Sequence, residues 1–140
     1  MASIFSRIIA GDLPGTFVWR DDAAVAFMSI APLQPGHTLV VPVEEVDHWI
    51  DLDVELTAHL MTVSRTIGRA IDAAFSPTKV GLMLAGLEVP HTHIHLVPIR
   101  GVHDLDFSNA DSSADPADIA AAAERIRAEL RTMGAVDVAG

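Results

Sequence analysis

A helical spacing of apolar residues occurs three times along the chain. It predicts a short helix over residues 3–10, a long helix over 53–75, and a last helix from about residue 115 to the break at Gly134. The apolar faces of the two longer helices comprise Leu56, Leu60, Val63, Ile67, Ile71 and Ala74, and Ile119, Ala123, Ile126 and Leu130. The acids Asp51, Asp53 and Glu55 mark the start of the long helix, where the helix dipole favours negative charge.

Five shorter segments have the composition or alternation of β-strands. They cover residues 16–20, 24–28, 38–43, 80–85 and 92–99. Pro42 in the third segment indicates that this strand lies at an edge or leaves the sheet there. The order of helices and strands lacks the regular strand–helix alternation of a parallel sheet. It therefore predicts an α+β fold with a mainly antiparallel sheet of five strands.

The composition narrows the possible functions. The 140 residues are 50% hydrophobic and 20% charged, as expected for one globular domain. No apolar run is long enough to span a membrane, and no leader sequence is evident, so we expect a cytoplasmic protein. The net charge of −10 argues against nucleic acid as a partner, although a small phosphorylated ligand is compatible with it. Without cysteine or tyrosine, catalysis would depend on histidines, carboxylates, hydroxyls and the single lysine, Lys79.

Three alternating histidines are the most informative feature. His91, His93 and His95 alternate with other residues, so a strand would place all three on one face, about 6.6 Å apart. Such a row suits an anion, because a phosphate stabilises protonated imidazoles while a neutral imidazole can attack it. His37, directly before the third predicted strand, is a candidate fourth imidazole at the same site.

Other interpretations of the histidine row remain open from the residues alone. The row could be a coincidence on an exposed strand. His-x-His on a strand also binds zinc when a third ligand comes from elsewhere, although Pro98, Ile99 and Arg100 follow where a further ligand would be useful. A phosphate-binding pocket without catalysis is the third alternative.

The motifs resemble those of the histidine triad (HIT) superfamily, in particular its HINT-like nucleotide-binding branch. HTHIHLV fits the pattern His-φ-His-φ-His-φ-φ, except that Thr92 replaces an apolar residue. The stretches SIFSRIIAGDLPG, DDAAVAFMSIAPLQPGHTLVVP and GLEVPHTHIHLVP extend the similarity over about residues 3–100. The resemblance implies a HIT domain over 1–100, with an acidic loop and a C-terminal helix in 101–140 packed on it. It also implies a homodimer with a ten-stranded sheet.

The resemblance implies a nucleotide hydrolase or transferase that acts at the α-phosphate of a small purine nucleotide. His93 would be the nucleophile and form a nucleotidyl-histidine intermediate. His95 and His37 would contact phosphate oxygens or the leaving group, and His91 would orient its neighbours through its backbone carbonyl. Phosphoramidates, aminoacyl adenylates and dinucleoside polyphosphates are the candidate substrates, and no cofactor is expected. The alternative is a nucleotide-binding or interaction protein with little turnover.

The same resemblance implies a purine pocket with several departures from the family pattern. Apolar positions that match the pocket are Ile4, Phe5, Ile8, Phe27 and Ile30, each of which also fits core packing. Ser29 replaces an aspartate that would bind the ribose, and Ala85 and Leu87 offer no side-chain hydrogen bonds.

Two further departures concern charge and metal. Glu88 would repel a phosphate, or else bind a leaving-group ammonium or pair with a histidine. Ser3 and Ser6 stand where some relatives carry two zinc-binding cysteines. Because serine is a poor zinc ligand, we expect no structural zinc, and we assign no metal ligand among the site residues.

Overall fold

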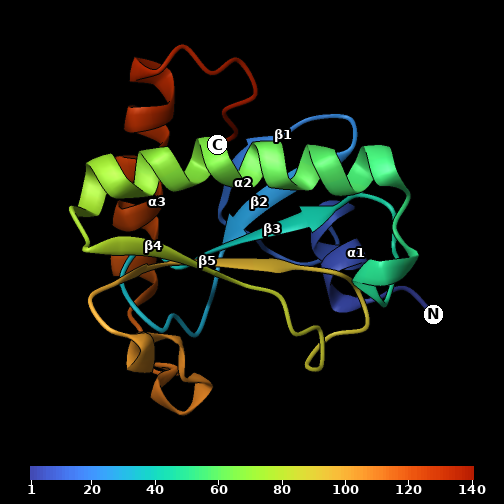
Figure 1. The fold of residues 1–140 in the computed structure, drawn as a ribbon, viewed down its shortest axis with the longest axis horizontal. Helices are drawn as coiled ribbons and strands as arrows, with labels where there is room; N and C mark the ends of the chain where they lie inside the picture. The colour runs from blue at the N-terminus through green and yellow to red at the C-terminus, as the bar shows by residue number, and fades with distance from the viewer.

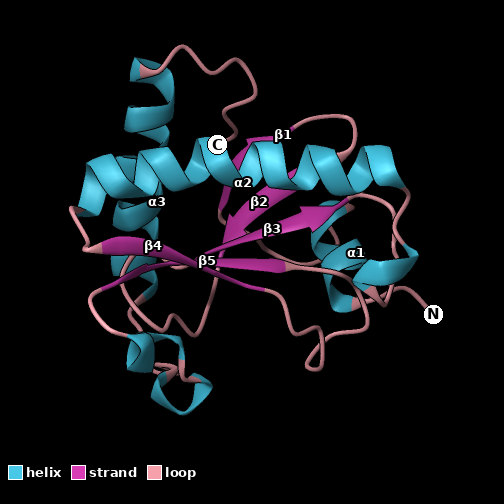
Figure 2. Ribbon diagram, viewed as in Figure 1, coloured by secondary structure: helices cyan, strands magenta, loops and turns pink.

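One five-stranded antiparallel sheet forms the centre of the computed structural model, which covers residues 1–140 (Figures 1 and 2). Its strand order is β1-β2-β3-β5-β4, and the strands are β1 (Phe17–Arg20), β2 (Ala24–Met28), β3 (Thr38–Pro42), β4 (Lys79–Met83) and β5 (Ile94–Ile99). The helices are α1 (Ile4–Ile9), α2 (Val54–Phe75) and α3 (Pro116–Thr132), with short 3-10 turns η1 (Trp49–Asp51), η2 (Val102–Leu105) and η3 (Phe107–Asn109). The predicted α+β class is confirmed.

Local signals in the sequence explain where the helices begin and end. The Asp53 carboxylate caps α2 by accepting a hydrogen bond from the Leu56 N–H at 2.7 Å, and Asp115 caps α3 in the same way through Ala117. α2 ends at Ser76, whose φ of 48° lies in the left-handed region. The caps therefore define both ends of α2. Figure 1 shows this helix lying across one face of the sheet.

The alternation of side chains along the strands creates two cores. The larger core lies between the sheet and the two long helices and contains, among others, Val40, Ile94, Leu96, Ile67 and Ile126. The smaller core lies on the other face and consists of Phe5 from α1 with Val25, Phe27, Leu39 and Val41. Since His95 is the register partner of Leu39, its side chain lies on the face of the smaller core.

Two strand predictions need correction. β5 begins at Ile94 and not at residue 92, so His91 and His93 lie in the connection before the strand. The backbone N–H and the hydroxyl of Thr92 both donate to the Val46 carbonyl, at 2.7 and 2.8 Å, which takes this part of the chain out of the sheet ladder. For β3, the structure decides between the two alternatives given for Pro42: the strand is central, and it ends at Pro42 as the second alternative predicts. β4 ends at Met83, two residues earlier than expected.

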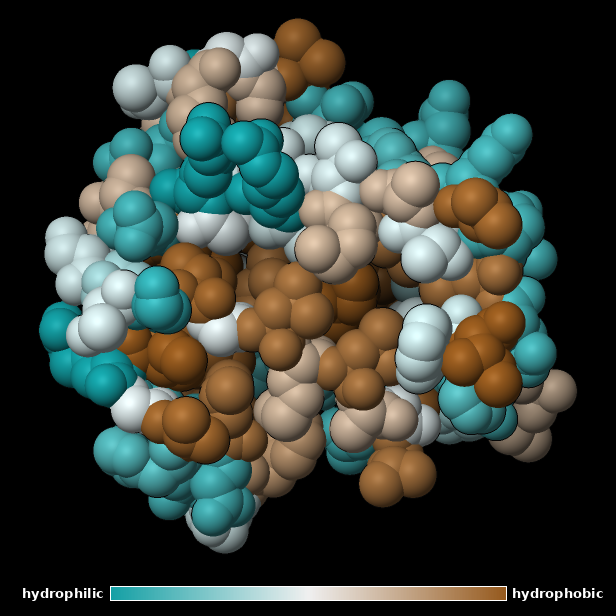
Figure 3. Space-filling view, viewed as in Figure 1, coloured by the Kyte–Doolittle hydropathy of each residue, from teal (hydrophilic) through white to brown (hydrophobic).

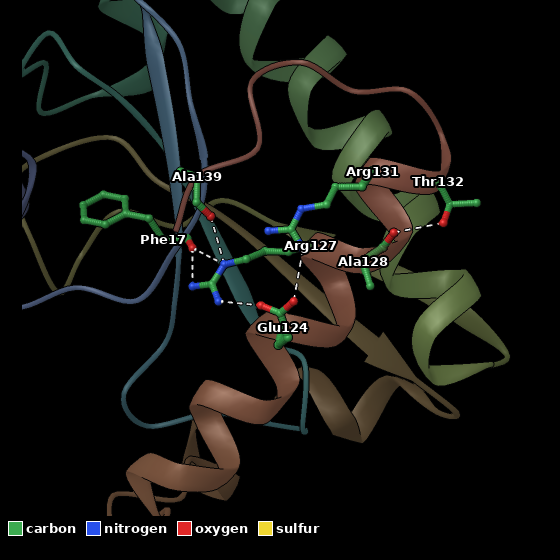
Figure 4. A network of polar contacts seen from close by, with 7 residues as sticks. All are labelled: Phe17, Glu124, Arg127, Ala128, Arg131, Thr132 and Ala139. Atoms are coloured by element: carbon green, nitrogen blue, oxygen red, sulfur yellow. Dashed lines mark hydrogen bonds and ion pairs between the residues drawn. The ribbon is translucent and has the colours of Figure 1, made fainter.

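The C-terminal helix is joined to the sheet by one partly buried arginine, Arg127 (Figure 4). The Arg127 guanidinium donates to the backbone carbonyls of Phe17 and Ala139 at 2.7–2.9 Å, and it pairs with Glu124 at 3.2 Å. These bonds join α3 to β1 and to the last residues of the chain.

None of the helices combines the length and the apolar run that crossing a bilayer requires.

Candidate active site

Four buried imidazoles gather at one end of the smaller core. His37, His91, His93 and His95 are each at most 5% exposed. The ring centroids of His93 and His95 lie 4.9 Å apart, and those of His37 and His95 lie 5.1 Å apart. His91 lies behind them, 6.0 Å from the Phe5 ring. The structure therefore brings together all four histidines singled out in the sequence, although only His95 lies on a strand.

The hydrogen bonds of His93 leave one ring nitrogen free. Its Nδ1 lies 2.7 Å from the backbone carbonyl of His91, which can only accept, so Nδ1 carries the hydrogen and donates. In the neutral ring Nε2 then has an unshared electron pair. This nitrogen lies 3.7 Å from the Glu88 Oε1 atom, beside the site mouth. His93 is therefore held in the tautomer that a nucleophile requires.

A backbone amide sets the opposite tautomer in His95. The Leu33 N–H donates to His37 Nδ1 at 3.0 Å, so the hydrogen of neutral His37 is on Nε2. His37 Nε2 in turn donates to His95 Nδ1 at 2.9 Å, which leaves the hydrogen of His95 on Nε2. That buried nitrogen has no hydrogen-bond partner within the chain. His95 therefore offers a proton donor next to the free nitrogen of His93.

Burial favours the neutral form of three of these imidazoles, His37, His91 and His95. Burial together with the neighbouring imidazoles lowers the pKa of His37 to about 3. For His95, burial and His93 lower the pKa to about 4, against the opposing effect of Glu88. Burial also lowers the pKa of His91, against the bond to the Pro42 carbonyl. The tautomers deduced above for His37 and His95 are those of neutral rings, so they apply at neutral pH.

A polar cluster under α1 holds His91 in place. Its Nε2 donates to the Pro42 carbonyl and its Nδ1 accepts from the Ser3 hydroxyl, both at 2.7 Å. Glu45 accepts from the Ser3 N–H at 2.6 Å and from the Ser6 hydroxyl at 2.7 Å. Two hydroxyls, one carboxylate and one imidazole are a poor donor set for zinc, and the hydroxyls already bond to their neighbours. The cluster fits a positioning role for His91 and not a metal centre.

A second set of possible metal ligands lies at the histidines themselves. One ligand atom each from Glu88, His93 and His95 lie within 4.8 Å of one another. A metal needs an unshared pair on each imidazole nitrogen, and the His37 bond places a hydrogen on His95 Nε2. Only His93 and Glu88 could then ligate, so these residues do not fit a metal either.

The predicted purine-pocket residues separate into two groups. Phe5 and Phe27 are buried, and the Phe5 ring meets His93 edge-on at 4.9 Å and Phe27 at 5.4 Å, while Ile8 is half-buried beside them. Ile4 and Ile30 are exposed, at 50% and 83%. Ser29 uses its hydroxyl to accept from the Ala31 N–H at 3.2 Å. Two apolar side chains are thus free to cover a ligand, while two others also belong to the core.

Sequence reasoning missed several parts of the site. The Phe107 ring, in the segment predicted to be an acidic surface loop, packs on His95 at 5.0 Å between ring centroids. It is the only aromatic residue (Phe, Trp or Tyr) in 101–118, a signal that could have identified it. The Leu33 amide and the Glu45 carboxylate were also missed, because backbone donors and long-range pairs leave no local motif.

The chain is similar to known proteins. The sequence model of the HIT domain matches residues 10–102. A HIT-like protein of Borreliella burgdorferi is 35% identical over 102 residues, which cover 68% of this chain and 73% of that protein. The adenosine 5'-monophosphoramidase of Schizosaccharomyces pombe is 29% identical over 99 residues, 70% of this chain and 74% of that one. The asymmetrical bis(5'-nucleosyl)-tetraphosphatase of the same organism is 32% identical over 98 residues, 66% of this chain and 52% of that one.

The fold is shared over nearly the whole chain. The crystal structure of a zinc-bound histidine triad family protein from Mycobacterium smegmatis superposes with a TM-score of 0.82 at 26% identity, covering 96% of each chain. The match includes the segment after residue 102, which lies beyond the domain found by the sequence model.

Proposed function

The chain belongs to the histidine triad family, and from this premise we propose that it is a nucleotide hydrolase or transferase. In this proposal it cleaves at the α-phosphate of a small purine nucleotide through a nucleotidyl-histidine intermediate. The observation that carries the proposal is the pair of opposite tautomers, a free His93 Nε2 beside a protonated His95 Nε2. The two activities named for the yeast relatives, on a phosphoramidate and on a tetraphosphate, support the reaction class.

The first step uses the Nε2 atoms of both His93 and His95. His93 Nε2 attacks the α-phosphorus, and a P–N bond forms as the bond to the leaving group breaks. His95 Nε2 gives its hydrogen to the leaving atom, so an amine departs neutral, and His95 is left as an imidazolate that still accepts the hydrogen bond from His37 Nε2. The His91 carbonyl continues to accept from His93 Nδ1 and stabilises the positive charge that develops on the ring.

The second step reverses the roles. Water attacks the phosphorus, and His95 Nε2, now without its hydrogen, accepts a proton from that water. The P–N bond breaks, its electrons return to His93, and nucleoside monophosphate leaves. Because the same two nitrogens act twice, the site regenerates itself without a cofactor.

The predicted binding residues complete the proposal. We place the purine against Phe5 and Phe27 under α1, with Ile4, Ile8 and Ile30 around it and the ribose near Ser29. Phe5 lies edge-on to His93, which supports a short path from base to phosphorus. His37 and His95 would then contact the phosphate oxygens.

A homodimer is part of the same proposal. β4 is an edge strand with an open ladder, and its Leu82 is 44% exposed. A groove of about 280 Å³ beside it is lined mostly by apolar residues: Trp49, Leu52, Thr57, Leu60, Met61, Leu82, Leu84 and Ile94. Figure 3 shows hydrophobic residues gathered on this face. Pairing two β4 edges would give the ten-stranded sheet.

The second candidate function is nucleotide binding with little turnover. It is favoured by the absence of polar side chains at Ala85 and Leu87 and by the Glu88 carboxylate near the phosphate position. Wild type and His93→Ala should each be incubated with an adenosine phosphoramidate and a diadenosine polyphosphate, with chelator present. AMP release by wild type alone supports the enzyme. Nucleotide binding without release by either protein supports the second candidate.

A further inference from the structure

The Glu88 carboxylate lies where the two reactive nitrogens converge. Its Oε1 atom is 3.5 Å from His95 Nε2 and 3.7 Å from His93 Nε2, and its side chain is 44% exposed. Burial raises the pKa of Glu88, but its own backbone N–H and the two imidazoles lower it more, so its pKa lies below the usual range. The carboxylate is therefore ionised at neutral pH, and it reaches both the site and the solvent.

The position relative to His95 locates the carboxylate on the leaving-group side. An atom that receives the hydrogen of His95 must come within about 3 Å of Nε2. Because Glu88 Oε1 lies 3.5 Å from the same nitrogen, the departing group passes directly beside the carboxylate. An anionic leaving group is repelled there, and a cationic one is attracted.

No basic side chain from the segments that carry the histidines offsets this charge. The sequence has no lysine or arginine in residues 21–64, which include His37, or in 80–99, which include the other three histidines. The same two segments contain nine acidic residues: Asp21, Asp22, Glu44, Glu45, Asp47, Asp51, Asp53, Glu55 and Glu88. A leaving polyphosphate, with several negative charges, would find no cationic partner from these segments.

We propose that Glu88 is a specificity-determining residue that selects nucleotides whose leaving group carries a positive charge, such as an amine with an ammonium arm. This inference rests on the proposed function and names its substrate class. In the step itself the P–N bond of the substrate breaks, the His93 P–N bond forms, and the departing nitrogen takes the hydrogen of His95. The ammonium on the arm keeps its own proton and pairs with the carboxylate.

Three matched substrates separate charge from size. They are adenosine 5'-phosphoramidates of a diaminoalkane, an amino alcohol and an amino acid of equal length, whose arms end in ammonium, hydroxyl and carboxylate. The kcat/KM of each is measured for wild type, Glu88→Gln and the control Glu44→Gln. Glu44→Gln changes the net charge by the same amount as Glu88→Gln. Glu44 is exposed, and its side chain contacts none of the four histidines.

The expected result is a preference for ammonium over hydroxyl over carboxylate in wild type and Glu44→Gln. The ammonium-to-hydroxyl ratio should fall by about fivefold in Glu88→Gln, as for a partly exposed ion pair. An unchanged ammonium-to-hydroxyl ratio in Glu88→Gln overturns the proposal. An equal increase in kcat/KM for all three substrates also overturns it, because Glu88 would then hinder every substrate regardless of charge.

A binding measurement keeps this test separate from that of the proposed function. If wild type releases AMP from none of the three, or if His93→Ala releases it equally well, the nucleotidyl-histidine mechanism fails. The Kd values of the three compounds are therefore also measured on His93→Ala with and without Glu88→Gln. Tighter binding of the ammonium compound that disappears with Glu88→Gln supports the role of Glu88, and equal binding of all three refutes it.

Discussion

Replacing His37 tests whether one backbone amide sets the chemistry of the site. His37 links the Leu33 N–H, 3.0 Å away, to His95 Nδ1, 2.9 Å away. His37→Phe keeps a ring but removes both bonds, whereas His37→Gln can keep a donor toward His95. Phe leaves two buried polar groups without partners at about 1–3 kcal/mol each, and Gln leaves one, so His37→Phe should be the less stable variant in urea unfolding.

The kinetic effect follows from the tautomer. Without the His37 donor, His95 no longer has its hydrogen fixed on Nε2, and the proton donor of the first step is lost part of the time. A positioned proton donor contributes about 10²–10⁴-fold. We therefore expect kcat to fall by about 10²-fold in His37→Phe and by less than about tenfold in His37→Gln.

The assay compares two leaving groups. An adenosine phosphoramidate of an alkylamine needs the proton, while an adenylate ester of an acidic nitrophenol can leave without it. His37→Phe should lose most of its rate on the first substrate and little on the second. Equal losses on both substrates, or equal rates for His37→Phe and His37→Gln, would refute the reasoning from tautomers.

Three further predictions concern stability and assembly. Because burial lowers the pKa of His37 to about 3 and that of His95 to about 4, the unfolded chain binds more protons below pH 6.5. The free energy of unfolding should therefore fall from pH 6.5 toward 4 by up to about 1.4 kcal/mol per pH unit for each histidine. When this free energy is measured by urea unfolding at several pH values, it should fall less steeply with decreasing pH in His37→Gln than in wild type. Arg127→Met should cost about 2–4 kcal/mol and lower Tm, because the Phe17 carbonyl loses its donor; an unchanged Tm would mean that the bonds in Figure 4 contribute nothing. Leu82→Asp should convert the proposed dimer into monomer in analytical ultracentrifugation, and a wild type that is already monomeric would exclude the β4 interface.

The elements were predictable because apolar periodicity is a local property. The 53–75 helix was expected from six apolar positions on one face and the acids at its start, and the structure differs only in that Asp53 is the N-cap and the helix begins at Val54. The start of β5 was not predictable in the same way. Thr92 leaves the ladder because of a bond to Val46, a residue 46 positions away, and no local pattern encodes that pairing.

The candidate site shows the same division between local and distant information. The histidines could be identified from their spacing, because a motif is a local property. The tautomers depend on the Leu33 amide and the His91 carbonyl, which carry no side-chain signature. The Phe107 ring reaches His95 only because β5 and η3 lie close together in the fold. Sequence therefore indicates which groups react, and the fold determines which nitrogen of each ring does so.

The stereochemistry at phosphorus tests the central claim most directly. A substrate made chiral at its α-phosphorus, with one oxygen replaced by sulfur and an isotopically labelled water as acceptor, reports the number of displacements. Attack by His93 Nε2 followed by attack by water gives two inversions, so the account predicts overall retention of configuration. Overall inversion would mean that water attacks the substrate directly and that His93 is not the nucleophile.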